Sequence, residues 1–236
     1  MSFYHDFSNY YDQIFPTSQD TVDYFQSLFR PSGRILDVGT GAGGYAIEMA
    51  SRGFSVDAID FDSGMISIAQ NKNKKLRLPV DFQTGDMLKI DALDTYDGIY
   101  CIGNTFVHLN SSTEMKVVLG NIFDALKPEG WLVLQIVNYD RILSHNITSL
   151  PTLRSGEVEF VREYEHVRGI IEFKTTLRTP SGTFKNQVEL YPIRQGDLFQ
   201  MLVDIGFHEV RSYGDFKSAS FDSDKAFMLV MKARKP

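Results

Sequence analysis

A short apolar segment followed at once by a glycine-rich loop constrains the fold of this chain more than any other feature. Residues 34–38 read RILDV, residues 39–44 read GTGAGG, and an apolar helical pattern then continues as far as Gly53. Glycine lets a backbone approach a ligand closely, and a helix N-terminus offers free N–H groups. The order of strand, loop and helix therefore predicts a ligand site at the carboxyl end of a strand in an α/β sheet.

The spacing of the glycines leaves two kinds of ligand open. Gly39, Gly41 and Gly44 match the G-x-G-x-x-G pattern of dinucleotide binding. Gly39, Gly41 and Gly43 match equally well the G-x-G-x-G pattern of methyltransferases that use S-adenosylmethionine. Asp60 ends the next strand pattern, and a carboxylate there can accept hydrogen bonds from both ribose hydroxyls of an adenosine. Both ligands contain that adenosine, so Asp60 does not choose between them.

Strand and helix patterns alternate through most of the chain. Further strand patterns cover residues 54–60, 80–86, 96–104 and 131–137, with helical patterns between them. This alternation favours an α/β fold with a doubly wound, mostly parallel, seven-stranded sheet of Rossmann-like type. From about residue 153 to 190, three strand patterns follow one another without helices, and a turn signal lies at 179–182. A small antiparallel β insertion is therefore expected before the last helix and strands.

These patterns divide the chain into four expected regions. They are an N-terminal lid or helical segment at 1–30, a core at 31–150, the β insertion on the acceptor side at 151–192, and a C-terminal completion of the core at 193–236.

Charge and composition narrow the partners. The net charge is −6, and the one dense basic stretch, at 71–78, lies at a predicted helix end where it suits the helix dipole. Cys101 is the only cysteine and lies in an apolar strand pattern, which favours a buried structural thiol. No apolar segment approaches the ~20 residues that span a bilayer, and the acidic N-terminus does not resemble a signal peptide. We expect a cytoplasmic monomer or homo-oligomer without nucleic-acid or membrane partners.

Three features favour S-adenosylmethionine over a nicotinamide dinucleotide. Asp37 lies two residues before the first glycine of the loop, where a carboxylate suits a cationic ligand end and would repel pyrophosphate. Gly85, Asp86 and Met87 end the third strand pattern and suit an adenine amino group and ring face, although Asp86 is also an ordinary turn residue. After Trp131 the chain shows no second nucleotide motif.

The motifs taken together resemble a known family. ILDVGTGAGG (35–44), VDAIDFDSGMI (56–66), GDM (85–87) and YDGIYCIGN (96–104) resemble the ordered motifs of class I S-adenosylmethionine-dependent methyltransferases. CIGNTFVHL (101–109), NYDRILS (138–144), LYP (190–192) and GDFK (214–217) are similar to stretches of glycine N-methyltransferases. The resemblance implies S-adenosylmethionine as the cofactor, with S-adenosylhomocysteine as its product, and a small-molecule methyl acceptor.

The resemblance also assigns residues to the site. It implies that Asn104 orients the acceptor amine, that His108 lies beside the methionine end, and that the Tyr11 hydroxyl accepts from the polarised methyl group. His108 is equally explained as a hydrogen-bond donor beneath the following helix, and Tyr11 as an aromatic staple. The residues expected to bind the cofactor are Asp37, Gly39, Thr40, Gly41, Gly43, Asp60, Phe61, Met65, Gly85, Asp86, Met87, Ile102, Gly103 and Thr105.

One departure from the glycine N-methyltransferases bears on the acceptor. Those enzymes carry an arginine immediately before Asn-Tyr-Asp that pairs with the glycine carboxylate, and this chain has Val137 there. Tyr191 is retained from the inserted sheet of that family, whereas Phe173 stands roughly where another tyrosine is expected. An acceptor without a carboxylate is at least as compatible, unless Arg141 or Arg194 supplies the charge. The residues expected to face the substrate are Asn104, Asn138, Arg141, Phe173 and Tyr191.

The expected reaction is in-line displacement at the sulfonium methyl group, most simply by an amine, which needs no strong base. A hydroxyl acceptor would need a base, for which His108 and Tyr11 are the best-placed candidates. No cluster of His, Cys, Asp and Glu has the spacing of metal ligands, so no metal is expected. The alternatives are a small-molecule O-methyltransferase acting on a metabolite or sugar, a non-catalytic S-adenosylmethionine-binding protein, and an NAD-dependent dehydrogenase.

Overall fold

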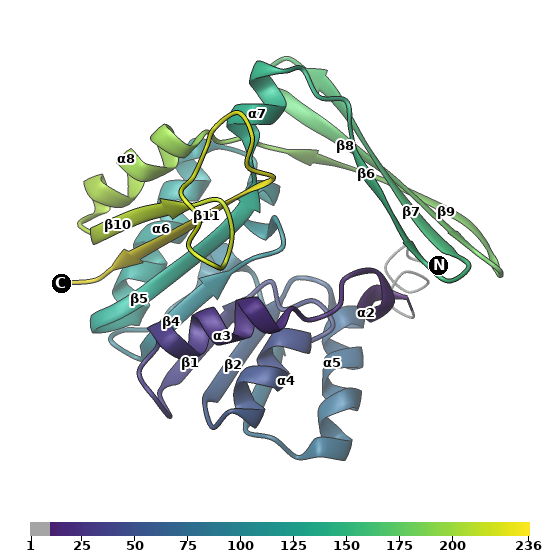
Figure 1. The fold of residues 1–236 in the computed structure, drawn as a ribbon. Coiled ribbons are helices and arrows are strands. Elements are labelled where there is room, and N and C mark those ends of the chain that lie inside the picture. Colours follow the sequence, from purple (N-terminus) through teal and green to yellow (C-terminus); the bar gives the residue numbers. More distant parts are fainter. Residues whose placement is uncertain (1–9) are drawn as a thin grey trace.

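The computed structural model of the chain describes residues 10–236 and contains a large and a small β-sheet (Figure 1). The large sheet has seven strands in the order β10-β11-β5-β4-β1-β2-β3. Strands β1 to β5 run parallel, and β11 is antiparallel to both of its neighbours. This confirms the predicted doubly wound, mostly parallel, seven-stranded sheet, in which β11, next to the edge strand β10, is the reversed strand. The bounds are β1 (Arg34–Val38), β2 (Ser55–Asp60), β3 (Val80–Thr84), β4 (Tyr96–Cys101), β5 (Leu126–Val137), β10 (His208–Tyr213) and β11 (Met228–Arg234).

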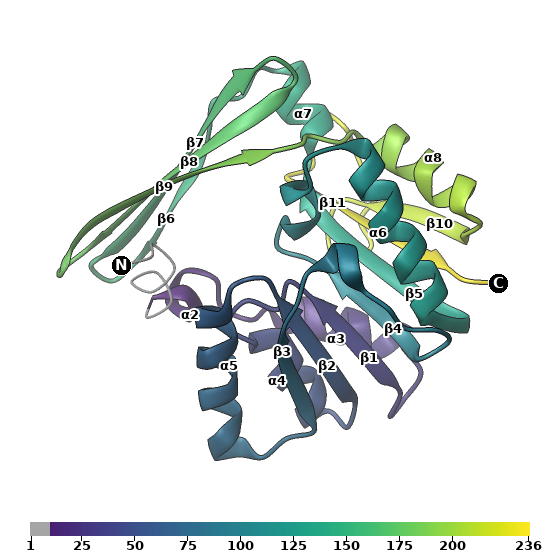
Figure 2. The ribbon, with the colours of Figure 1, turned by 180° about the vertical axis from the view of Figure 1, so that it is seen from behind.

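Helices cover both faces of the large sheet (Figures 1 and 2). One face packs against α3 (Gln19–Leu28), α4 (Gly44–Ser51) and α5 (Ser63–Leu76), and the other packs against α6 (Ser112–Ala125) and α8 (Gln195–Ile205). Alternate residues of the central strands face the two layers, so Cys101 lies in one apolar cluster and Tyr100 in the other. Cys101 is 1% exposed and burial raises the pKa of its thiol, as expected for a structural cysteine.

Side-chain caps begin two of the long helices. The Asp62 carboxylate accepts hydrogen bonds from the backbone of Gly64 and Met65, which caps α5. The Ser111 hydroxyl accepts from the Glu114 backbone N–H at 3.2 Å and caps α6. Four shorter helices are α2 (Tyr11–Ile14), η1 (Met87–Lys89), η2 (Thr105–His108) and α7 (Tyr139–Ser144). Within residues 10–236, none of the helices combines the length and the apolar character needed to cross a membrane.

The small sheet is a four-stranded antiparallel insertion. Its strands, in sequence order, are β6 (Ser149–Ser155), β7 (Val158–Val167), β8 (Ile170–Thr179) and β9 (Gly182–Leu190). The sequence predicted only three strands, because Pro151 interrupts the strand pattern of β6. Proline is tolerated on an edge strand, and β6 lies at the edge of this sheet.

The inserted sheet reaches from α7 to the N-terminal helix α2 (Figure 1). At one end Phe160 and Leu177 pack with Ile14 of α2. At the other end Tyr164 and Ile171 join the main apolar core. The insertion therefore bridges the N-terminal segment and the strand ends of the large sheet, where the ligand site is expected.

Candidate active site

An open cavity of about 610 Å³ lies at the carboxyl ends of the parallel strands. This is the edge of an α/β sheet at which ligands bind. The residues lining it come from α2, from the last residues of β1 and β2, from the segments that follow β1 to β4, and from the starts of α5 and α6. They are Tyr11, Val38, Gly39, Gly41, Ile59, Asp60, Phe61, Asp62, Met65, Gly85, Asp86, Met87, Leu88, Gly103, Thr105, His108, Leu109, Asn110 and Glu114.

The glycine loop after β1 closes one side of this cavity. Gly39 and Gly41 have φ angles of 78° and 55°, in the left-handed region that favours glycine. A β-carbon on Gly39 would collide with Thr105, and one on Gly41 would lie 2.9 Å from the Tyr11 hydroxyl. The loop is fixed to β2 because the backbone N–H of Gly39 donates to the Ile59 carbonyl at 2.8 Å. These contacts explain why side chains are absent where a ligand would approach.

Asp60 ends β2 with its carboxylate in the cavity wall. One of its oxygens accepts from the Gly41 N–H at 2.8 Å, and the other accepts from the Asp62 N–H at 2.9 Å. Each carboxylate oxygen keeps a further lone pair, so two ribose hydroxyls can still be bound. Burial raises the pKa of Asp60. Asp62 caps the following helix, which leaves Asp60 available for the ligand.

Asp37 lies behind the loop and not in the cavity wall. It is 2% exposed, and its carboxylate accepts a hydrogen bond of 2.7 Å from the Thr40 hydroxyl. Burial raises the pKa of Asp37 to about 7. Gly43 packs against α5 and β3, and Ile102 belongs to the apolar core, so these two predicted cofactor residues also lie outside the lining. Thr40 is absent from the lining too, so Asp37, Thr40, Gly43 and Ile102 all lie behind the cavity wall.

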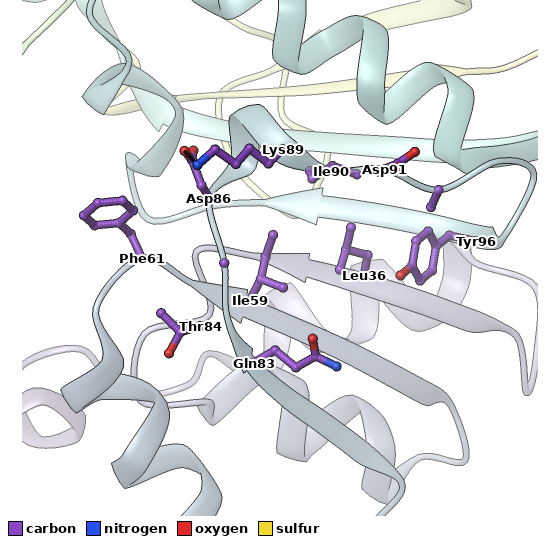
Figure 3. A pocket seen from close by; sticks show the side chains of 12 residues that line it. Leu36, Ile59, Phe61, Gln83, Thr84, Asp86, Lys89, Ile90, Asp91 and Tyr96 are labelled. Carbon is purple, nitrogen blue, oxygen red and sulfur yellow. Dashed lines mark ion pairs between the residues drawn. The ribbon is translucent and has the colours of Figure 1, made fainter.

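The far end of the cavity offers an apolar surface suited to an adenine ring. Phe61 is 81% exposed there, between the end of β2 and the start of α5. One oxygen of Asp86 accepts from the Leu88 N–H at 3.0 Å and caps η1, which satisfies its predicted turn role, and the other lies 3.9 Å from the Lys89 ammonium. A second hollow of about 620 Å³ shares Phe61 and Asp86 with this cavity and continues towards Tyr96 (Figure 3).

The segment after β4 joins the cavity to the inserted sheet. Gly103 and Thr105 line the cavity, and Asn104 between them has a φ of 69°. The Asn104 side-chain oxygen accepts from the Val137 N–H at 3.0 Å, and its Nδ2 donates to the Tyr139 hydroxyl at 3.0 Å. Asn104 is therefore held in one orientation by the end of β5 and the start of α7.

The sequence motifs did not identify Tyr139 or Tyr164 as residues near the site. Tyr139 is 1% exposed, and its hydroxyl lies close to that of Tyr164 on β7. Burial raises the pKa of Tyr164 to about 12, so this phenol stays protonated. The NYDRILS motif contained Tyr139, whereas no local pattern marked Tyr164 as its partner.

The two candidate proton-handling residues both reach the cavity. Desolvation of the His108 ring by the surrounding protein lowers the pKa of the imidazole, which keeps it neutral at physiological pH. Burial raises the pKa of Tyr11, so its phenol is also uncharged. The Tyr11 ring lies 5.4 Å from the Phe15 ring, so this side chain both packs α2 and approaches the glycine loop.

The predicted acceptor residues lie in different surroundings. Asn138 is 1% exposed, accepts from the Arg141 N–H at 3.1 Å, and donates to the Ala226 carbonyl at 2.9 Å, so its amide holds backbone segments together. The ring centroid of Phe173 lies 5.4 Å from that of Tyr164, and Tyr191 packs against the main apolar core.

Arg141 and Arg194, which could supply the charge missing at Val137, differ in their surroundings. Arg194 lies 3.7 Å from the Asp140 carboxylate, so its charge is already matched. Arg141 is half-buried on α7. Val137 itself is 8% exposed and packs in the core.

Comparison with known proteins decides the family. Residues 35–130 match the family model described as a methyltransferase domain. The chain is 33% identical over 216 residues to the glycine/sarcosine N-methyltransferase of Halorhodospira halochloris, spanning 88% of this chain and 78% of that protein. The chain belongs to the S-adenosylmethionine-dependent methyltransferases.

Solved structures agree with this methyltransferase fold. An S-adenosylmethionine-dependent methyltransferase from Clostridium acetobutylicum superimposes with a TM-score of 0.82 at 14% identity, covering 99% of both chains. The CcbJ methyltransferase from Streptomyces caelestis gives a TM-score of 0.81 at 18% identity, covering 99% of this chain and 98% of that one.

The cavity of this methyltransferase fits its cofactor. The glycines after β1 leave room where side chains would project, Asp60 offers free lone pairs for ribose hydroxyls, and the exposed Phe61 ring suits adenine. The cofactor predicted from the sequence is confirmed by the family, and the dehydrogenase alternative is not supported. The roles of individual residues stay predictions.

Proposed function

We propose that this methyltransferase transfers the methyl group of S-adenosylmethionine to the nitrogen of a small amine. The observation that carries the proposal is the fixed amide of Asn104, which lies between two cavity-lining residues. An amide oxygen is a good acceptor for an amine N–H and a poor base for a hydroxyl. An amine can donate one N–H to Asn104 and still direct its lone pair at the methyl group. The relative from Halorhodospira halochloris is named as an N-methyltransferase, which also supports nitrogen as the acceptor atom.

The cofactor supplies a methyl group activated by a cationic sulfur. The residues of the chain then have to align the amine and exclude water. In this proposal the inserted sheet and α2 close the acceptor side, and Asn104 orients the amine. The neutral imidazole of His108 can take up the proton that an ammonium acceptor must lose.

The test is a methyl-transfer assay with matched acceptors. The protein is incubated with S-adenosylmethionine and either small amines or the corresponding alcohols, and S-adenosylhomocysteine and methylated products are measured by mass spectrometry. The proposal expects N-methylated products, and Asp60→Ala as a cofactor-site variant should abolish them. O-methylated products alone would replace it with the O-methyltransferase alternative. Binding of S-adenosylhomocysteine without transfer to any acceptor would indicate a non-catalytic binding protein.

A further inference from the structure

The inward face of the inserted sheet carries an arginine that none of the motifs marked. Arg162 lies on β7 midway between Phe160 and Tyr164, and side chains two residues apart on a strand share a face. Phe160 packs with Ile14 of α2, and Tyr164 joins the main core. Arg162 therefore faces the body of the protein.

Arg162 belongs to a polar row across three strands. The register pairs Arg162 with Thr175 on β8 and Thr175 with Asn186 on β9. The neighbouring rows on the same face are apolar: Phe160, Leu177 and Phe184 on one side, and Tyr164, Phe173 and Val188 on the other. The first apolar row packs at α2 and the second at the core, so the polar row lies between the two contacts.

Two groups in this row are buried without a partner. The Nε of Arg162 and the hydroxyl of Thr175 are both inaccessible to solvent and make no hydrogen bond within the described residues. Arg162 donates from Nη2 to the Pro151 carbonyl at 2.6 Å, and none of the acidic side chains described forms an ion pair with it. Burial lowers the pKa of Arg162. By contrast, Arg178 on the outward face pairs with Glu159.

The polar row is connected to the proposed acceptor site. Tyr164, the next inward residue of β7, lies close to the Tyr139 hydroxyl, which accepts from Asn104. A small molecule with an amine at Asn104 and an anionic group at Arg162 would lie along this line. Arginine and a hydroxyl together match a carboxylate, which accepts several hydrogen bonds at once.

We infer that Arg162 and Thr175 bind the carboxylate of an amino-acid acceptor, in place of the arginine whose position Val137 occupies. This inference rests on the proposed N-methyltransferase function and adds the substrate class to it. Among the arginines considered, Arg194 is already paired with Asp140, and Arg141 is the alternative that the test must exclude.

The test compares amino acids with amines that lack the carboxylate. The acceptors are glycine, sarcosine, β-alanine and 4-aminobutyrate, each measured beside its carboxyl-free amine. For wild type we expect the best amino acid to exceed its amine at least 100-fold in kcat/KM. Arg162→Gln should lower that value at least 100-fold, mainly through KM, and change the value for the amine less than threefold. Arg162→Lys should restore part of the loss, and the isosteric Thr175→Val should cost about tenfold.

Two controls separate binding from folding. Arg178→Gln on the outward face of the same sheet should leave all values unchanged, and Arg141→Gln should leave the preference for the carboxylate intact. Calorimetric titration of the same amino acids into the complex with S-adenosylhomocysteine should show binding that Arg162→Gln abolishes, whether or not transfer is observed.

Three results would overturn the inference. They are a wild-type preference for the amines without carboxylate, an equal loss on both acceptor types in Arg162→Gln and Thr175→Val, and a loss of carboxylate preference in Arg141→Gln alone. The first of these leaves the N-methyltransferase proposal standing. Transfer only to hydroxyl groups would instead refute that proposal, while the calorimetric titration would still decide the role of Arg162.

Discussion

The backbone N–H of Gly41 donates a 2.8 Å hydrogen bond to the carboxylate of Asp60. This bond joins the glycine loop after β1 to the end of β2, the strand that pairs with β1 in the sheet. The same carboxylate faces the cofactor cavity. Asp60 therefore fixes the loop and presents acceptors for ribose hydroxyls at once.

Replacement of Asp60 tests this double role. Asp60→Ala should weaken S-adenosylhomocysteine binding by about 100-fold or more, because hydrogen bonds to a charged group contribute about 1.5–3 kcal/mol each. Asp60→Asn keeps one acceptor oxygen and should lose less. Isothermal titration calorimetry measures both. Asp81→Ala is the control, because the Asp81 carboxylate lies exposed on β3 and, within residues 10–236, accepts a hydrogen bond from the Gln83 side chain alone. Unchanged affinity in Asp60→Ala would remove the residue from the cofactor site.

Gly41 allows a test of the close approach between the loop and α2. Gly41→Ala places a β-carbon 2.9 Å from the Tyr11 hydroxyl at a φ of 55°. The left-handed conformation should cost about 1–2 kcal/mol of unfolding free energy, and displacement of Tyr11 should weaken cofactor binding about tenfold or more. Gly53→Ala is a matched control: its φ is 95°, and a β-carbon there meets nothing within 4 Å. It should lose stability and keep its affinity, and equal affinities of the two variants would contradict the prediction.

The large sheet and most of the cofactor cavity followed from local sequence. Strand and helix patterns and the glycine loop are each set by neighbouring residues, so they are visible without tertiary structure. The packing of Asp37 and Ile102 behind the loop was not visible, because burial depends on elements far along the chain. Asn138 shows the same limit: its amide binds the carbonyl of Ala226, which no local pattern connects to it.

The acceptor side was harder to predict. The strand β6 was missed because Pro151 interrupts its pattern. A proline is compatible with a strand at the edge of a sheet, and the sequence does not show which strand lies at the edge. Arg162 became a candidate only through the register of three hairpin-linked strands, which brings Thr175 opposite it. A shift of one residue would place Arg162 on the outward face, and the sequence pattern does not fix that register.

The raised pKa of Asp37 predicts a pH dependence of stability. Its folded-state pKa of about 7 lies above the value of about 3.9 expected in the unfolded chain. Between these values the folded protein holds a proton that the unfolded chain releases. The free energy of unfolding therefore falls as pH rises from about 4 to 7, by at most about 1.4 kcal/mol per pH unit.

Asp37→Asn removes this titration. The stability of the variant relative to wild type should rise between about pH 5 and 7 and level off above pH 8, as measured by urea unfolding of the ligand-free proteins. Asp81→Asn, at an exposed position, should show the wild-type profile. Parallel pH curves for Asp37→Asn and wild type would mean that Asp37 is ionised throughout.

Tyr139 offers a way to disturb Asn104 without touching the cofactor cavity. Tyr139→Phe removes the hydroxyl that accepts from Asn104 Nδ2 at 3.0 Å and leaves this donor without its partner. The free energy of unfolding should fall by about 1–3 kcal/mol, and kcat should fall about tenfold, because the amide that orients the acceptor is no longer fixed. Affinity for S-adenosylhomocysteine should stay within twofold, since Tyr139 does not line that cavity.

A matched phenol separates positioning from stability. The Tyr96 hydroxyl donates to Asp57 at 2.8 Å at the opposite end of β4, so Tyr96→Phe also loses a hydrogen bond but leaves Asn104 intact. We expect Tyr96→Phe to lose stability while keeping kcat, measured with the best acceptor at saturating cofactor. If both variants kept kcat, the hydrogen bond from Asn104 to Tyr139 would not be needed to orient the acceptor. If both lost kcat equally, the loss would follow stability, and the role of the tyrosine would be structural.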